Sequence, residues 1–196
     1  AAAVAQRGIH LIHLSSDHLY DGPGPSKEDM ARPVNVYART KFEGESAALA
    51  VGATVLRTNF VGRSVVPGRR SLSDWMVGCL RTGVPFTVFR DVFFSPLHVS
   101  TVCHCIEQAV VSNCGGIFNL GARGGVSKAE FAVILADLLG ADRSRMVVGD
   151  YFDVAQAVVR PRDMTMAVEK FEAAFGFTLP EIGGEIELLA DQYRMG

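Results

Sequence analysis

Two side chains near the start of a predicted helix could transfer a proton together. Tyr37 and Lys41 are four residues apart, so on a helix both project from the same face. A lysine ammonium beside a phenol stabilises the phenolate, which suits tyrosine to general acid–base catalysis. Ser16 ends an apolar strand, and in parallel sheets ligands collect where the strands end. Its hydroxyl could bind a substrate carbonyl oxygen beside the tyrosine.

The elements that would position these residues alternate between strand and helix. Apolar runs at 8–16 and 53–61 predict strands, and we expect the first to be buried on both faces. Helices are predicted over 36–51 and 72–82. A Gly/Pro-rich loop covers 21–35. This order predicts a βαβ unit, with parallel strands and a right-handed crossover.

The remainder of the chain is less regular. Ser127 followed by Glu130 forms a capping-box pattern that predicts the start of a helix. The other expected elements are strands at 85–89, 117–120 and 146–148, and helices at 100–112, 127–139, 163–175 and 181–194. We therefore expect an α/β fold, with a small mixed α/β lobe over most of 83–196 beside a larger sheet carried by 1–82.

The motifs in this order resemble those of the extended short-chain dehydrogenase/reductases, within them the dTDP-4-dehydrorhamnose reductase branch. They read SSDHLYDG at 15–22, PVNVYARTKFEGE at 33–45, VLRT at 55–58 and RPRD at 160–163. The resemblance covers nearly the whole chain. It implies the C-terminal part of a Rossmann-type doubly wound parallel sheet plus a small substrate lobe.

The resemblance also implies a reaction, the NADPH- or NADH-dependent reduction of a nucleotide-linked 4-keto-6-deoxy sugar. Tyr37 would give the proton to the sugar carbonyl, and Ser16 would polarise that carbonyl. Lys41 would assist Tyr37 and bind the nicotinamide ribose. An epimerase or dehydratase of the same superfamily would use the same three residues, and we keep that as an alternative.

Further binding residues are implied in the same way. Ser15 and Phe60 would join Tyr37 and Lys41 in binding the cofactor. Asp17 and Arg160 would bind substrate, although a structural salt bridge is an equally good interpretation of Arg160. His18 and Phe60 stand where the reductases usually have Tyr and Trp, which leaves the choice of sugar open.

A non-catalytic role is a second alternative. The β subunit of methionine adenosyltransferase has the same type of fold and also has S-S-D before its loop and R-P-R near its tail. That protein binds a partner enzyme rather than turning over a sugar. Because it keeps the tyrosine and the lysine, these residues do not separate the two functions.

The glycine-rich fingerprint of a dinucleotide-binding fold, G-x-G-x-x-G, does not occur before Ser16, and GARGG at 121–125 has the wrong spacing. We therefore expect about 90 residues of the family fold to be absent from this chain. The strand at 8–16 would then have an unpaired apolar edge. We expect the chain alone to bind dinucleotide poorly and to associate, with a homodimer as one possibility.

Composition excludes several other classes of function. The net charge is −2 and the 19 Lys and Arg residues are scattered, which excludes nucleic acid as a partner. No apolar run approaches the roughly 20 residues of a membrane span, so we expect a cytoplasmic protein. Cys103 and Cys105 would point about 200° apart on a helix, so we expect no metal site at Cys103-His104-Cys105.

Overall fold

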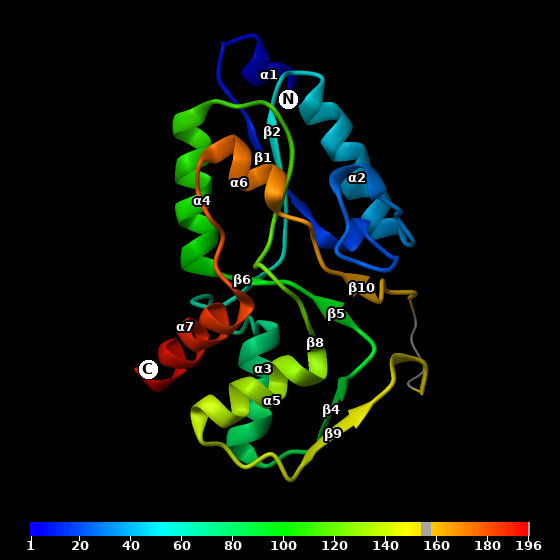
Figure 1. The fold of residues 1–196 in the computed structure, drawn as a ribbon, viewed down its shortest axis with the longest axis vertical. Helices are drawn as coiled ribbons and strands as arrows, with labels where there is room; N and C mark the ends of the chain where they lie inside the picture. Colours follow the sequence, from blue (N-terminus) through cyan, green and yellow to red (C-terminus); the bar gives the residue numbers. More distant parts are fainter. Residues whose placement is uncertain (154–157, 196) are drawn as a thin grey trace.

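A computed structural model describes residues 1–153 and 158–195 of the chain. Its centre is a parallel sheet of β1 (Ile12–Ser16), β2 (Thr54–Thr58) and β7 (Gly116–Leu120), in the order β1-β2-β7 (Figure 1). The register places Ser16 beside Thr58. All three strands run in the same direction, as the βαβ pattern predicts, so their carboxyl ends lie at the same end of the sheet.

Helices cover both faces of this sheet. On one face lies α2 (Val36–Leu49), whose Ala48 packs against Ala53 and Val55. On the other face lie α4 (Val99–Ser112) and α6 (Glu169–Phe175). The residues buried together on that side are Leu56, Leu97, Val102, Phe118, Leu120 and Phe171. Successive residues of β2 thus lie on opposite faces, and Val55 and Leu56 are each buried under a different layer of helices.

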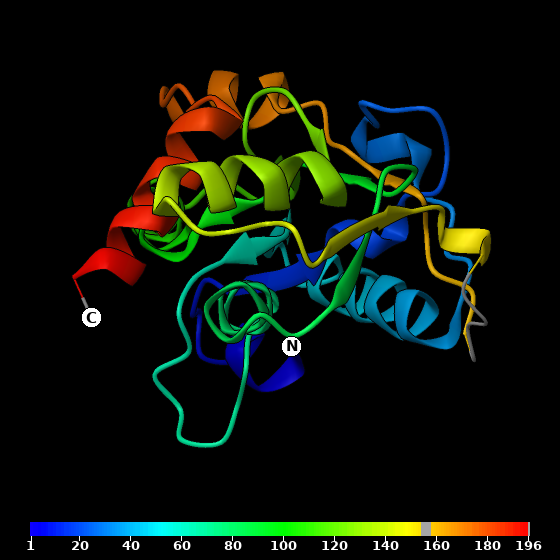
Figure 2. The ribbon, with the colours of Figure 1, turned by 90° about the horizontal axis from the view of Figure 1, so that it is seen from below.

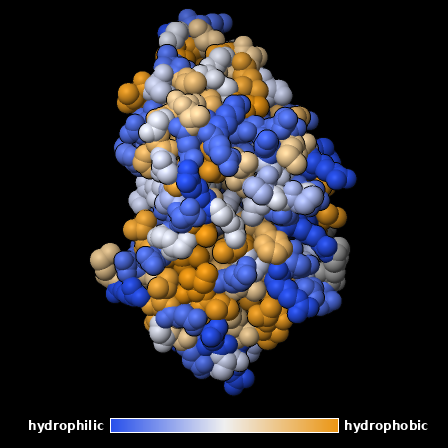
Figure 3. Space-filling model, viewed as in Figure 1, coloured by the Kyte–Doolittle hydropathy of each residue, from blue (hydrophilic) through white to orange (hydrophobic). Residues whose placement is uncertain are grey.

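A second hydrophobic core lies below the sheet in Figure 1. It is built by α3 (Leu72–Thr82), α5 (Lys128–Leu139) and α7 (Ile182–Arg194), with the parallel strands β4 (Phe86–Phe89) and β9 (Met146–Gly149). Its buried side chains include Met76, Leu80, Phe131, Leu135, Ile186 and Leu189. Figure 3 shows hydrophobic residues on the surface of this part of the molecule. Ile134 and Leu138 of α5 are only partly buried against the core.

Short strands connect the two cores. β3 (Phe60–Val61) pairs with β6 (Leu97–His98), and β5 (Phe93–Phe94) pairs with both β8 (Val126–Ser127) and β10 (Asp163–Met164). The remaining elements are α1 (Ala2–Ala5) and the 3-10 turns Asp17–Leu19, Glu28–Met30 and Tyr151–Asp153. Figure 2 shows the segment 62–71, between β3 and α3, as a loop that extends away from the body.

Three of the predicted elements need correction. The strand expected over 53–61 is divided into β2 and β3, which belong to different sheets. The first strand begins at Ile12 rather than at residue 8, and Leu14 is 39% exposed because β1 lies at the edge of its sheet. The helix expected over 163–175 begins only at Glu169. The Asp163 carboxylate accepts hydrogen bonds from the backbone N–H groups of Gly24 and Thr165, which ties this stretch to a distant loop.

Cys103 and Cys105 point in different directions on α4, as predicted from helix geometry. Cys105 is fully buried and Cys103 is exposed. The two side chains thus lie on different sides of one helix. Within 1–153 and 158–195, no three His, Cys, Asp or Glu residues are grouped so as to bind a metal ion. None of the helices described over these ranges has the length and apolar character required to cross a membrane.

Candidate active site

Two serines and an aspartate lie at the carboxyl end of β1. Ser16 is buried, and its Oγ accepts a hydrogen bond from the His18 N–H at 3.2 Å and donates one to Asp17 Oδ1 at 3.3 Å. This contact begins the 3-10 turn Asp17–Leu19. The Ser16 hydroxyl is thereby held at the carboxyl end of its strand, where the sequence predicts a substrate-polarising group.

The first turn of α2 presents the tyrosine and the lysine. Asn35 begins the helix, because its Oδ1 accepts a hydrogen bond from the Ala38 N–H at 2.9 Å. Tyr37 lies on this first turn and is 51% exposed. The Lys41 ammonium donates a hydrogen bond to the backbone carbonyl of Leu14 at 3.2 Å, which fixes the lysine against β1.

These residues line one cavity of about 310 Å³. The predicted site residues that it brings together are Ser15, Ser16, Asp17, Tyr37, Lys41 and Phe60. His18, Thr58 and Asn59 contribute to the same wall. Residues far apart in the sequence therefore meet at the strand ends, although the role of each remains a prediction.

Arg160 lies elsewhere. It is exposed and lines a second cavity of about 420 Å³, between the lobe of α5 and the strand ends. His18 and Asn59 border both cavities, so the two spaces are adjacent. Arg160 therefore lines a different cavity from Ser16, Tyr37 and Lys41, and its charge acts on His18, which borders both.

Two buried hydroxyl groups in the first cavity have no hydrogen-bond partner among the described residues. They are Ser15 Oγ and Thr58 Oγ1, on neighbouring strands. Buried polar groups without partners are rare in folded proteins, and many of them bind a ligand or water. Ser15 and Thr58 lie with Lys41 in the lining of this cavity.

Asp17 is a buried carboxylate that organises the site. Its Oδ2 accepts a hydrogen bond of 2.5 Å from Asn59 Nδ2, and its Oδ1 accepts one from Ser16. Burial raises the pKa of Asp17, an effect opposed by His18 and by the bond from Asn59. Both oxygens are thus used within the protein, which favours a positioning role for this carboxylate over the substrate contact predicted from the sequence.

His18 packs edge-on against the Tyr37 ring, with the ring centroids 5.5 Å apart. Burial lowers the pKa of His18, and the Asp17 carboxylate opposes that shift. A neutral imidazole therefore stands beside the candidate proton donor near neutral pH. This packing matches the interpretation of His18 as a replacement for an aromatic side chain.

Sequence reasoning missed two residues of the site. Asn59 directly follows β2, but the strand predicted over 53–61 placed it inside a strand, so its position at a strand end could not be seen. Lys128 opens α5 and lines the second cavity, where burial lowers its pKa to about 7. The capping pattern predicts the start of this helix, but it carries no information about which cavity the lysine faces.

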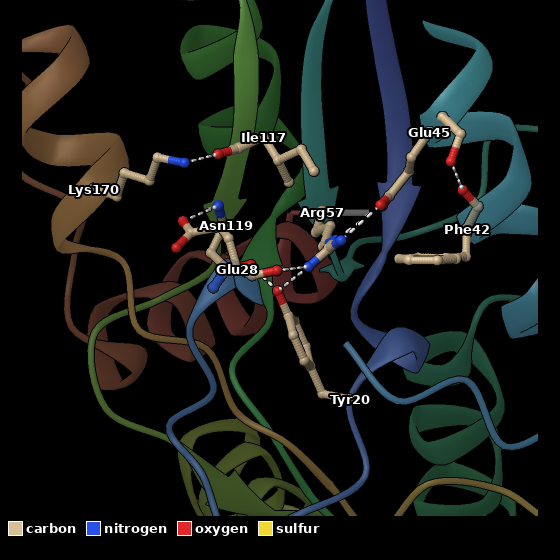
Figure 4. A network of polar contacts seen from close by, with 9 residues as sticks. Tyr20, Glu28, Phe42, Glu45, Arg57, Ile117, Asn119 and Lys170 are labelled. Atoms are coloured by element: carbon tan, nitrogen blue, oxygen red, sulfur yellow. Dashed lines mark hydrogen bonds and ion pairs between the residues drawn. The ribbon is translucent and has the colours of Figure 1, made fainter. Parts of the chain in front are cut away.

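Next to the strand ends, a buried network holds the loop, β2 and α2 together (Figure 4). The Arg57 guanidinium donates two hydrogen bonds to the Glu45 carboxylate, at 2.9 and 2.7 Å. It also donates to the Tyr20 hydroxyl and to the Glu28 carbonyl, each at 2.7 Å. Tyr20 in turn donates to Asn119 Oδ1 at 2.6 Å. The helix that carries Tyr37 and Lys41 is thereby fixed to the strand beside the site.

Comparisons with known proteins agree with this architecture. A family model described as the RmlD substrate-binding domain matches residues 1–195. A dTDP-4-dehydrorhamnose reductase of Sinorhizobium fredii is 29% identical over 199 residues, which cover 92% of this chain and 65% of that protein. This chain therefore spans less than the full length of that relative.

Two further matches bear on fold and function. The β subunit of methionine adenosyltransferase 2 of Bos taurus is 46% identical over 162 residues, covering 74% of this chain and 47% of that protein. The crystal structure of a dTDP-4-dehydrorhamnose reductase from Bacillus anthracis in complex with NADP superposes with a TM-score of 0.86 at 18% identity, over 95% of this chain and 67% of that one. The arrangement of strands and helices is thus Rossmann-like, and the chain belongs to the RmlD substrate-binding domain family.

Proposed function

We propose that this protein is an NAD(P)H-dependent reductase of a nucleotide-linked 4-keto-6-deoxy sugar. The observation that carries the proposal is the meeting of Ser16, Tyr37 and Lys41 in one cavity. Adjacent to it lies a second cavity with apolar walls and basic residues, which suits the nucleotide part of such a substrate. A cytoplasmic location follows from this proposal, because cofactor and substrate are small cytoplasmic metabolites.

The residues of the first cavity divide the work of carbonyl reduction. When bound, NADPH or NADH supplies the hydride. Tyr37 donates a proton to the carbonyl oxygen, and the Lys41 ammonium stabilises the phenolate that remains. Ser16 donates its hydroxyl hydrogen to the same oxygen, exchanging its present bond to Asp17 for one to substrate. Ser15, Thr58, Lys41 and Phe60 would hold the cofactor.

The test is oxidation of NADPH by the purified full-length protein with dTDP-4-keto-6-deoxyglucose. Tyr37→Phe removes only the proton donor, so we expect kcat to fall by about 10²- to 10⁴-fold while NADPH binding is retained. Tyr193→Phe, which removes a hydroxyl from the lower core, is the matched control and should keep wild-type kcat. Full activity of Tyr37→Phe would overturn the assignment.

The second candidate is a non-catalytic regulatory subunit. It is favoured by one observation, the 46% identity to the β subunit of methionine adenosyltransferase 2 of Bos taurus over 74% of this chain. Calorimetry with a methionine adenosyltransferase catalytic subunit distinguishes the two functions. Tight binding without turnover of the keto sugar supports the regulatory role, whereas turnover that depends on Tyr37 supports the reductase.

A further inference from the structure

Lys128 is a lysine enclosed between the two lobes. It is the first residue of α5, it is half-buried, and it lines the cavity of about 420 Å³ together with Arg160. Its Nζ lies 3.0 Å from the centroid of the Phe94 ring. In the part of the chain that the structure describes, no side-chain or backbone oxygen accepts a hydrogen bond from this ammonium.

The charged and titratable groups that face Lys128 are Asp17, His18 and Arg160. Burial lowers the pKa of Lys128 to about 7; the Asp17 carboxylate opposes this shift and the Arg160 guanidinium adds to it. A buried ammonium with no ion-pair partner in contact costs stability. Such an arrangement is common at functional sites, where a ligand supplies the missing partner.

The remaining walls of the cavity suit an aromatic base joined to an anion. Trp75, Met76 and Phe89 contribute apolar side chains to its lining. The charges of Lys128 and Arg160 both act on His18, which borders the cavity. Beyond His18 is the cavity of Tyr37. A sugar nucleotide with its sugar beside Tyr37 would therefore place its diphosphate near Lys128 and Arg160 and its base near the aromatic wall.

We propose that Lys128 binds the diphosphate of the substrate and that its charge sets the affinity for sugar nucleotides. The substrate class rests on the proposed function, but the role of Lys128 does not require catalysis. The ammonium and the Arg160 guanidinium together match the two negative charges of a nucleoside diphosphate sugar. The Phe94 ring contacts the ammonium through a cation–π interaction.

Isothermal titration with dTDP-glucose tests this proposal on the full-length protein. This probe has no keto group, so binding is measured without reduction. We expect Lys128→Met to weaken binding by about 10- to 100-fold, the value of a lost charged hydrogen bond, and Lys128→Arg to restore most of it. Lys170→Met is the control, because Lys170 also lies over a phenylalanine ring but outside this cavity. Equal affinity of Lys128→Met and wild type, or failure of Lys128→Arg to restore binding, overturns the proposal.

A pH series separates this role from a structural one. The diphosphate of dTDP-glucose has no monoester proton to lose, so its charge is constant from about pH 6 to about pH 9. Wild-type affinity should fall as the pH rises through 7, with proton uptake on binding, and this dependence should vanish in Lys128→Met. A pH dependence that persists in Lys128→Met overturns the proposal. If the protein binds dTDP-glucose through Lys128 but does not oxidise NADPH with the keto sugar, only the proposed reductase function is overturned.

Discussion

At the residue scale, the buried ammonium of Lys128 lowers the stability of the fold. Its ammonium is enclosed over the Phe94 ring, and its pKa is lowered to about 7 by burial. The unfolded chain exposes the same lysine to water, where its pKa returns to the ordinary 10.5. Keeping the proton in the folded state therefore costs free energy at neutral pH.

The sign of this effect gives a prediction for Lys128→Met. Between about pH 7 and pH 10.5 the unfolded wild-type chain binds a proton that the folded chain has released, so wild-type stability rises with pH over this range. We expect Lys128→Met to be more stable than wild type at pH 7, with the difference shrinking towards pH 10. Urea unfolding at both values measures it. A difference that grows with pH would contradict the assigned shift.

The grouping of Ser16, Tyr37 and Lys41 in one cavity could be predicted because its signals are local, whereas the place of Lys128 could not. Tyr37 and Lys41 share a helix face by spacing alone, and Ser16 ends an apolar run. Lys128 reaches the cavity only because β8 pairs with β5, more than thirty residues earlier in the chain. The spacing of nearby residues in the sequence therefore could not show that Lys128 lies near Asp17.

At the scale of the elements, the Arg57 network explains how α2 is held against β2. Both members of the Arg57–Glu45 ion pair are buried, with 1% and 2% of their side-chain surfaces exposed. The same guanidinium binds the loop through Tyr20 and Glu28. Removing one charge of such a pair leaves the other buried without a partner, which costs far more than removing both.

We predict that Arg57→Met lowers the free energy of unfolding by about 3–5 kcal/mol, because Glu45 is then buried and unpaired. The double variant Arg57→Met/Glu45→Leu should recover a large part of that loss. Urea unfolding of wild type, both single variants and the double variant forms a double-mutant cycle. Additive losses would show that the two side chains do not act as a pair.

Elements with strong local signals were predicted well, and those set by distant contacts were not. The start of α5 was predicted because Ser127 and Glu130 form a capping box, which the structure confirms. The stretch at 163–164 was predicted as helix, but it pairs with β5 and therefore extends as a strand. Helical residue types there are outweighed by hydrogen bonds to a segment seventy residues away.

At the scale of the molecule, the sheet and the lower lobe meet where the two cavities join. Ser16, Tyr37 and Lys41 come from the sheet and its helix, whereas Lys128 comes from the lower lobe. Asn59 borders both spaces and is bonded to Asp17. The relative position of the lobes therefore decides whether a ligand bound by Lys128 presents its sugar to Tyr37, and the proposed reaction depends on the whole arrangement.

The edge of the sheet yields the last prediction. β1 is the outer strand of its sheet in the described residues, and Leu14 on it is 39% exposed. An unpaired edge with apolar side chains promotes association, which a lysine on the edge opposes. We expect a polypeptide of these 196 residues alone to associate at micromolar concentrations and Leu14→Lys to reduce that association, measured by light scattering. Val111→Lys, at an 83% exposed position on α4, is the matched control and should associate as the unmodified chain does. A monomeric 196-residue chain, or equal effects of the two lysines, would show that the β1 edge is not the contact surface.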